Sequence, residues 1–274
     1  MRLADLSMAG KVAIVTGGGQ GIGRAICLAL GRAGATVCVA DLDRGCAEAV
    51  AGELRAAGGE SSAVQADVTR EADVAEMVRV TLERHGHVDV LVNNAGGASG
   101  QDFAIGRVEN LRERDWDDTF AVNVKSTFLC SRAVTAPMRQ RGGGSIINMG
   151  SVTGLFPFPG MPAYSAAKAA VISLTKSLAM ELAPHVRVNA LAPGLIETER
   201  TSRNRRAEQL IQLLSNVPLG RMGSVEEVAD MALYLASDAA AYITGTVMEV
   251  GGGQVWMAEN GHPAFRDLGI RRPS

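Results

Sequence analysis

A tyrosine and a lysine lie four residues apart in the segment YSAAK, and this pair could carry out proton chemistry. The chain has only three tyrosines, and one of them, Tyr164, is followed by Lys168. Residues i and i+4 share one face of a helix. A free tyrosine has a pKa of about 10, which a nearby cation lowers by stabilising the phenolate. The pair is therefore a candidate general acid/base, although surface pairs without a function can have the same spacing.

A glycine-rich segment, TGGGQGIG over residues 16–23, could bind the phosphates of a nucleotide. It follows an apolar run and opens a helical pattern. A turn without side chains lets the backbone approach a pyrophosphate, and the N-terminus of the following helix favours the anion. The spacing is wider than the common G-x-G-x-x-G, and a turn that serves only close packing is the alternative. The predicted contacts are Gly17, Gly19, Gln20, Gly21 and Ile22.

Asp41 ends the second apolar run and points to a particular cofactor. A carboxylate at this place can accept hydrogen bonds from both hydroxyls of an adenosine ribose. It would repel the 2′-phosphate of NADP, and the turn carries Gln20 rather than a basic residue. We therefore predict NAD as the cofactor, with Leu42 also in contact. The following Asp43 is better suited to cap the next helix.

Apolar strand-like runs alternate with longer helical patterns along the whole chain. This alternation argues for a parallel sheet covered by helices on both faces. We predict an α/β fold, a doubly wound sheet of about seven strands, in a single catalytic domain over 1–274 with a core at about 9–253. Strands are expected at 12–17, 35–41, 61–68, 88–96, 144–151, 186–194 and 245–253, and helices at about 21–33, 43–57, 71–85, 112–140 and 162–183.

Composition argues against several classes of protein. The formal net charge of −2 provides no basic field for nucleic acid, and no apolar run reaches the roughly 18 residues of a membrane helix. The N-terminus lacks the features of a signal peptide, so we expect a cytoplasmic protein. The four cysteines form no C-x-x-C pair, and Cys27 and Cys38 should be buried free thiols. The four histidines form no ligand cluster, so no metal site is expected.

The ordered set of motifs resembles the classical short-chain dehydrogenase/reductase family. TGGGQGIG is followed by NNAG at 93–96, Asn123, Ser151, YSAAK and PGLIET at 193–198. Ser151 precedes Tyr164 at the spacing typical of that family. No single motif is decisive, but the ordered set is highly specific and spans about 9–253. The resemblance implies a Rossmann-like sheet and a dimer or tetramer.

The resemblance also implies a role for each motif residue. Tyr164 would exchange a proton with the substrate oxygen, and Lys168 would lower the pKa of the phenol and hold the nicotinamide ribose. Ser151 would hydrogen-bond the substrate oxygen, and Asn123 would position a water in a proton relay. The implied cofactor contacts are Asp67 and Val68 at the adenine, Asn94, Ala95 and Gly96 behind the ribose, and Pro193, Gly194, Ile196 and Thr198 at the nicotinamide end.

We predict an NAD-dependent oxidoreductase that interconverts a small-molecule secondary alcohol and a ketone. One alternative is a 3-oxoacyl-thioester reductase of the same family, although such enzymes usually prefer NADP. A second is a non-catalytic dinucleotide-binding scaffold, since a fold does not fix a function, but Ser151, Tyr164 and Lys168 are all present. A third is an epimerase or dehydratase, for which the chain is short.

Three segments bear on the substrate and on assembly. Phe156, Phe158 and Met161 could line an apolar substrate site or a subunit interface, and the loop from Thr198 to about Leu219 is a candidate lid whose arginines could meet an acidic substrate. The extension at 254–274 carries large apolar side chains, Trp256 and Phe265. We predict a homotetramer, or a homodimer, in which this extension packs on a neighbouring subunit; folding back on its own chain is the alternative.

Overall fold

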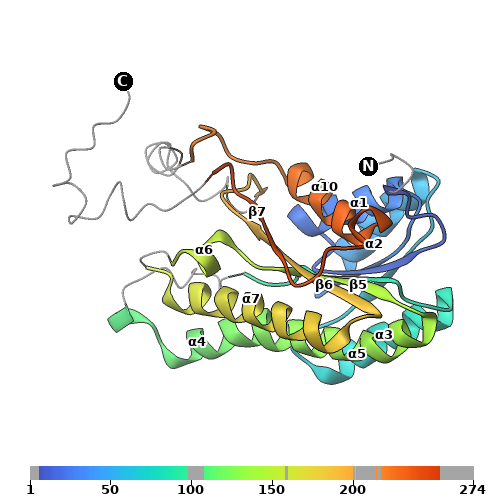
Figure 1. Cartoon of the computed structure of the whole chain (residues 1–274), viewed down its shortest axis with the longest axis horizontal. Helices are drawn as coiled ribbons and strands as arrows, with labels where there is room; N and C mark the ends of the chain where they lie inside the picture. The colour runs from blue at the N-terminus through green and yellow to red at the C-terminus, as the bar shows by residue number, and fades with distance from the viewer. Residues whose placement is uncertain are drawn as a thin grey trace.

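The computed structural model describes residues 6–97, 108–157, 160–199, 201, 214 and 217–253. Its centre is a seven-stranded sheet with the order β3-β2-β1-β4-β5-β6-β7, and all neighbouring strands are parallel. Helices cover both faces of this sheet (Figure 1). The predicted doubly wound, Rossmann-like α/β fold is confirmed.

The strands coincide with the predicted apolar runs, but several end earlier than expected. β1 is buried throughout its length, as a parallel strand covered on both faces should be. β4 ends before Asn94 because the N–H groups of Asn94 and Ala95 donate to the Thr16 hydroxyl. The strands are β1 (Val12–Thr16), β2 (Thr36–Asp41), β3 (Ser61–Gln65), β4 (Val90–Asn93), β5 (Gly144–Met149), β6 (Val186–Pro193) and β7 (Val247–Val250).

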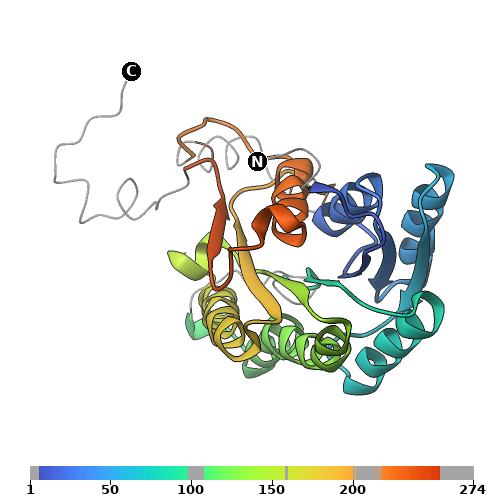
Figure 2. The same cartoon turned by 45° about the vertical axis from the view of Figure 1, so that its right-hand side comes forward.

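Two layers of helices enclose the sheet, and each layer has its own apolar core. Helices α1, α2 and α10 pack on one face, and α3, α5 and α7 pack on the other (Figures 1 and 2). Successive strand residues point to opposite faces, so Ile14 and Val15 of β1 belong to different cores. The helices are α1 (Gly21–Arg32), α2 (Arg44–Ala56), α3 (Glu71–His85), α4 (Glu113–Phe120), α5 (Ser126–Arg141), α6 (Val152–Leu155), α7 (Pro162–Leu182) and α10 (Val225–Ala236).

Two local features differ from the expected helices. The helix expected over 112–140 is divided by a π-helical segment, Ala121–Lys125, which contains the buried Asn123. Segments of this kind occur often at functional sites. The short helix α6 was not expected, and it follows directly after Ser151, whose side chain caps it. Both departures therefore lie at predicted site residues.

Several smaller expectations can also be compared with the structure. Cys27 and Cys38 are buried free thiols, and Asp43 caps α2 by accepting a hydrogen bond from the Cys46 N–H, so these predictions are confirmed. In the described part of the chain, no helix combines the length and apolar character needed to cross a membrane. Phe158, most of the predicted lid between Thr198 and Leu219, and the extension at 254–274 lie outside the described residues.

Candidate active site

The glycine-rich turn joins β1 to α1, and most of its glycines leave no room for a Cβ atom. Gly17 and Gly21 have φ values of +60° and +52°, a region that favours glycine. A Cβ atom on Gly23 would lie 2.0 Å from the carbonyl oxygen of Gly17. The first turn of α1 has no acidic residue, and its cap residue Gln20 makes no side-chain cap. The bare turn and the start of this helix therefore fit a dinucleotide pyrophosphate.

Hydrogen bonds fix this turn to the end of β4. The Thr16 hydroxyl accepts from the N–H groups of Asn94 and Ala95 at 3.0 and 3.1 Å. The Asn94 side-chain amide donates to the carbonyl oxygens of Thr16 and Gly17 at 3.0 and 2.9 Å. The structure thus places the predicted residues Asn94 and Ala95 beside the glycine-rich turn, where they hold its shape.

Asp41 lies at the rim of the same turn. Its Oδ2 accepts from the Gly19 N–H at 2.9 Å, and its Oδ1 accepts from the Asp43 N–H at 3.0 Å. The neighbouring Leu42 is 66% exposed. A Cβ on Gly19 would come within 2.6 Å of the Cys46 Cβ, so Cys46 also borders this corner. Sequence reasoning missed Cys46 because no motif marks it.

The predicted adenine residues lie in the loop after β3. The Ala66 N–H donates to the carbonyl oxygen of Asp41 at 2.9 Å, which joins this loop to the end of β2. The Asp67 carboxylate accepts from the N–H and the hydroxyl of Thr69 at 3.0 and 2.7 Å, and Val68 is buried. The strand predicted to run to Val68 therefore ends at Gln65, because Asp67 forms a turn of its own.

Tyr164 and Lys168 lie on α7, and Lys168 reaches the end of β5. The Lys168 Nζ is 5.6 Å from the centroid of the Tyr164 ring, so the helix brings the pair together as its spacing predicts. Lys168 is only 4% exposed, and its Nζ donates to the Met149 carbonyl oxygen at 2.7 Å. Ser151 follows two residues later and is buried as well. These three candidate catalytic residues therefore lie close to the end of β5.

The π-helical segment brings Asn123 to the same place. Its amide donates to the carbonyl oxygens of Gly97 and Thr119 at 2.7 and 2.8 Å, and its Oδ1 accepts from the Gly97 N–H at 3.0 Å. A Cβ on Gly96 would lie 2.6 Å from the Asn123 Oδ1 and 3.4 Å from the Lys168 Nζ. The backbone at Gly96 thus lies between these two polar groups, and only a glycine fits there.

The PGLIET segment returns from β6 to the start of α1. Gly194 follows Pro193 and donates its N–H to the Val250 carbonyl oxygen at 3.0 Å, and Ile196 is buried. A Cβ on Gly21 would meet the Thr198 Cγ2 at 3.8 Å. The structure therefore also brings this last predicted segment to the glycine-rich turn.

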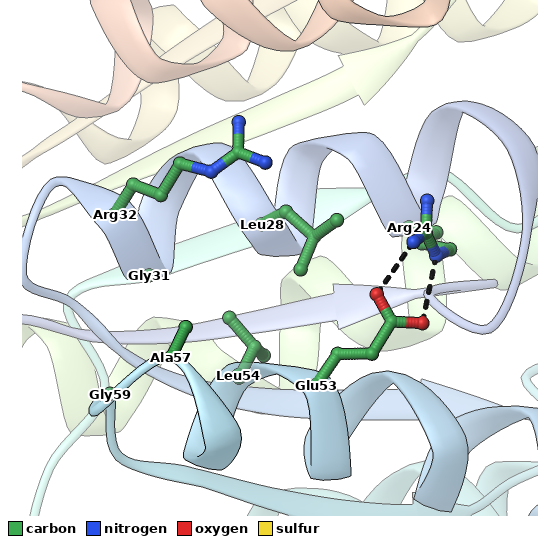
Figure 3. A pocket seen from close by; sticks show the side chains of 8 residues that line it. All are labelled: Arg24, Leu28, Gly31, Arg32, Glu53, Leu54, Ala57 and Gly59. Atoms are coloured by element: carbon green, nitrogen blue, oxygen red, sulfur yellow. Dashed lines mark hydrogen bonds and ion pairs between the residues drawn. The ribbon is translucent and has the colours of Figure 1, made fainter.

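A groove of about 240 Å³ lies elsewhere, between α1 and α2 (Figure 3). Arg24 and Glu53 form an ion pair across it at 2.6 Å, and both side chains are nearly half exposed. None of the predicted site residues lines this groove, so we assign it no part in the chemistry. Its lining residues are Arg24, Leu28, Gly31, Arg32, Glu53, Leu54, Ala57 and Gly59.

Comparisons with known proteins agree with this arrangement. A family model described as "Enoyl-(Acyl carrier protein) reductase" matches residues 17–254. The 3-oxoacyl-(acyl-carrier-protein) reductase of Synechocystis sp. is 43% identical over 252 residues, which are 91% of this chain and 98% of that protein. The 2-(S)-hydroxypropyl-CoM dehydrogenase 3 of Xanthobacter autotrophicus is 39% identical, over 89% of this chain and 96% of its own.

A solved structure shows the same likeness in three dimensions. It is a 7 alpha-hydroxysteroid dehydrogenase in complex with NADH and 7-oxo glycochenodeoxycholic acid, 32% identical, with a TM-score of 0.88 over 93% of this chain and 98% of that one. The resemblance inferred from the motifs is therefore confirmed. The chain belongs to the classical short-chain dehydrogenase/reductase family of oxidoreductases, which bind a nicotinamide dinucleotide.

Proposed function

We propose that this protein is an NAD(H)-dependent oxidoreductase that interconverts a ketone and a secondary alcohol, with 3-oxoacyl thioesters as its substrate class. One observation carries the proposal. The buried Lys168 ammonium donates to the Met149 carbonyl oxygen and faces Gly96, on the same helix face as Tyr164. A cation at this place supports proton transfer by the phenol, next to a turn that fits a dinucleotide.

The preference for NAD(H) rests on Asp41. Its carboxylate is anchored at the rim of the glycine-rich turn by the N–H groups of Gly19 and Asp43. There it can accept hydrogen bonds from the ribose hydroxyls, and a 2′-phosphate would meet a like charge. The solved relative described above is in complex with NADH, which is in keeping with this assignment.

The substrate class rests on the relatives. Several curated relatives at about 40% identity are named 3-oxoacyl-(acyl-carrier-protein) reductases, which favours the thioester alternative over an unspecified alcohol. The two interpretations share one reaction, since a 3-oxoacyl group is a ketone that becomes a secondary alcohol. In this proposal Asp41 selects the cofactor, whereas the substrate is selected at the nicotinamide end of the site. An NADH-linked 3-oxoacyl reductase is therefore the combination that we propose.

The chain's own side chains would handle the proton and the oxygen. In the reducing direction, the hydroxyls of Ser151 and Tyr164 donate hydrogen bonds to the ketone oxygen, and Tyr164 gives that oxygen its proton. Bound NADH supplies the hydride to the carbonyl carbon. Lys168 stabilises the phenolate that remains, because opposite charges attract, and Asn123 would hold a water that restores the proton. The reverse sequence oxidises the alcohol.

The test is a comparison of initial rates with purified protein. Acetoacetyl-CoA is offered with NADH and with NADPH, and a panel of 3-hydroxyacyl thioesters, hydroxysteroids and short secondary alcohols is offered with NAD. We expect turnover of the 3-oxo thioester, with kcat/KM for NADH at least about tenfold above NADPH, a difference of roughly 1.4 kcal/mol. A kcat/KM for NADPH equal to or above that for NADH would contradict the cofactor assignment. A failure to turn over any thioester would contradict the substrate class.

We also propose that the protein acts in the cytoplasm as a homotetramer or homodimer. Trp116 and Phe128 on α4 and α5 are 40% and 43% exposed, and Met180 on α7 is 82% exposed. Large apolar side chains are common in interface cores, so these helices are candidates to pack between subunits. Sedimentation equilibrium tests this assembly, and a monomer at micromolar concentration would contradict it.

A further inference from the structure

Ser151 receives two hydrogen bonds from a single residue, Thr153. The Ser151 Oγ accepts from the Thr153 N–H at 3.2 Å and from the Thr153 hydroxyl at 3.0 Å. A serine hydroxyl has one proton to donate and two acceptor lone pairs. Both acceptor positions are therefore used inside the short helix α6, and the Ser151 proton is left for a donated bond.

We propose that Thr153 is a positioning residue that makes Ser151 a dedicated hydrogen-bond donor to the substrate oxygen. This inference rests on the proposed function, in which that oxygen is a ketone or an alcohol oxygen. Both are acceptors of the Ser151 proton, so the same orientation serves both directions. Without the Thr153 hydroxyl, Ser151 could turn an unused lone pair toward the substrate oxygen, and two acceptors facing each other repel.

The close packing of α6 on α7 gives the hydrogen-bonded pair of Thr153 and Ser151 a fixed orientation. A Cβ on Gly154 would lie 2.6 Å from the carbonyl carbon of Lys168 and 2.8 Å from the Ala169 nitrogen. The backbones of the two helices are therefore in direct contact at the catalytic lysine. Ser151 is only 7% exposed and Thr153 is partly buried, so solvent access to their contact is restricted. A donor held in place before the substrate arrives needs no reorganisation during the reaction.

Helix capping alone does not account for the contact with the Thr153 hydroxyl. The cap of α6 is the bond from the Thr153 N–H to the Ser151 side chain, and any residue at position 153 except proline keeps that N–H. The hydroxyl bond is an addition to the cap. Thr153→Val removes only the hydroxyl and keeps the β-branched shape, while Thr153→Ser keeps the hydroxyl.

The first experiment compares ketone reduction with NADH in wild type, Thr153→Val and Thr153→Ser. The loss of one hydrogen bond is expected to lower kcat in the valine variant about three- to tenfold. The KM for the ketone and the Kd for NADH should stay within about twofold, and the serine variant should recover most of the rate. The matched control is Thr135→Val, which removes a hydroxyl that donates to Ser131 within α5 and should leave kcat unchanged.

A double-mutant cycle then asks whether Thr153 acts through Ser151. In a Ser151→Ala background, Thr153→Val should cost no further rate, because the group that it orients is gone. An equal loss in both backgrounds, or a wild-type kcat in Thr153→Val, would overturn the inference. The same cycle can be measured by urea unfolding, which needs no substrate. A coupling free energy of zero between positions 151 and 153 would overturn this inference and leave the proposed function standing. A wild type that binds NADH but reduces no ketone overturns the proposed function, and the positioning role falls with it.

Discussion

Lys168 keeps a charged side chain inside the protein, where a charge is costly unless it is paired or hydrogen-bonded. Its Nζ donates to the Met149 carbonyl and lies 5.6 Å from the centroid of the Tyr164 ring. A lysine that served only solubility would stay in water, as the exposed Lys176 does on the same helix. The burial of Lys168 therefore favours a part in the proton chemistry of Tyr164 over a chance surface pair.

Replacing Lys168 by methionine should change the pH dependence of alcohol oxidation. Oxidation needs the deprotonated phenol, and the cation favours that form, so the pH of half-maximal rate should move upward in the variant. The measurement is kcat against pH with NAD and a 3-hydroxyacyl thioester, with the exposed Lys176→Met as control. A profile that keeps its position on the pH axis would show that Lys168 does not act on the proton step.

Asp41→Ala should weaken the binding of NADH and reduce the kcat/KM advantage of NADH over NADPH. The variant loses an acceptor for the ribose hydroxyls, and hydrogen bonds to a charged group contribute about 1.5–3 kcal/mol. We expect the ratio of kcat/KM values for the two cofactors to fall at least about tenfold. Asp41→Asn is the matched variant, since it keeps an acceptor oxygen but removes the charge that would repel a 2′-phosphate. If the alanine variant kept the wild-type ratio, Asp41 would not be the selecting residue.

In the first turn of α1 the backbone packs so closely that a glycine is needed, whereas a glycine inside α2 has open space around it. A Cβ on Gly23 would lie 2.0 Å from the Gly17 carbonyl oxygen, whereas a Cβ on Gly52, inside α2, would meet nothing within 4 Å. Gly23→Ala should therefore distort the turn and weaken NADH binding by at least about tenfold. Gly52→Ala should leave binding unchanged and stabilise the protein by about 0.5–1 kcal/mol. Fluorescence titration measures the NADH affinity of each variant, and urea unfolding measures its stability. A Gly23→Ala variant with the NADH affinity of the wild type would contradict the tight fit at Gly23.

The C-terminal end of α10 has no basic residue of its own and is capped from β6. Arg187 donates to the carbonyl oxygens of Leu235 and Ser237 at 2.8 and 3.2 Å, and burial lowers the pKa of its guanidinium. Arg187→Met should leave the Leu235 carbonyl with only the Ser145 hydroxyl as donor and the Ser237 carbonyl with only the Ala240 N–H. The loss of the two bonds from Arg187 should reduce the free energy of unfolding by about 1–3 kcal/mol. The control is Arg139→Met, because Arg139 makes a similar bond to the Glu181 carbonyl at the surface. Equal urea midpoints for the two variants would refute a specific role of the buried cap.

The predicted site residues come from different strands, and the sheet topology unites them. Gly17, Asp41, Asn94, Ser151 and Pro193 each stand at or just after the carboxyl end of a strand, in β1, β2, β4, β5 and β6. The strand order reverses between β1 and β4, and ligands of such sheets bind outside the carboxyl ends at this reversal. The whole site therefore follows from parallel strands in this order.

The sequence could predict features that local spacing determines. The glycine-rich turn, the shared face of Tyr164 and Lys168, and the cap at Asp43 each depend on a few consecutive residues. The ordered motifs then supplied the family, which the comparisons confirm. Substrate choice could not be predicted, because it depends on side chains brought together from distant segments.

The features that the sequence did not reveal depend on contacts between elements. The end of β4 is set by the hydroxyl of Thr16, which comes from another strand. The π-helical segment around Asn123 follows from the paired hydrogen bonds with Gly97, far away in the sequence. The hydrogen bond that Ser151 accepts from the Thr153 hydroxyl depends on a rotamer that no spacing rule fixes.

The central claim is that Tyr164 moves the proton while a hydride passes between NADH and a ketone. The most direct measurement uses NADH deuterated at the transferred position, with acetoacetyl-CoA and mass spectrometry of the product. The wild type should give a 3-hydroxy product with one carbon-bound deuterium. Tyr164→Phe should bind NADH within a few-fold but form that product at least about a hundredfold more slowly, since it lacks the phenolic proton. A wild-type product without deuterium, or a phenylalanine variant with more than about a tenth of the wild-type rate, would contradict the account.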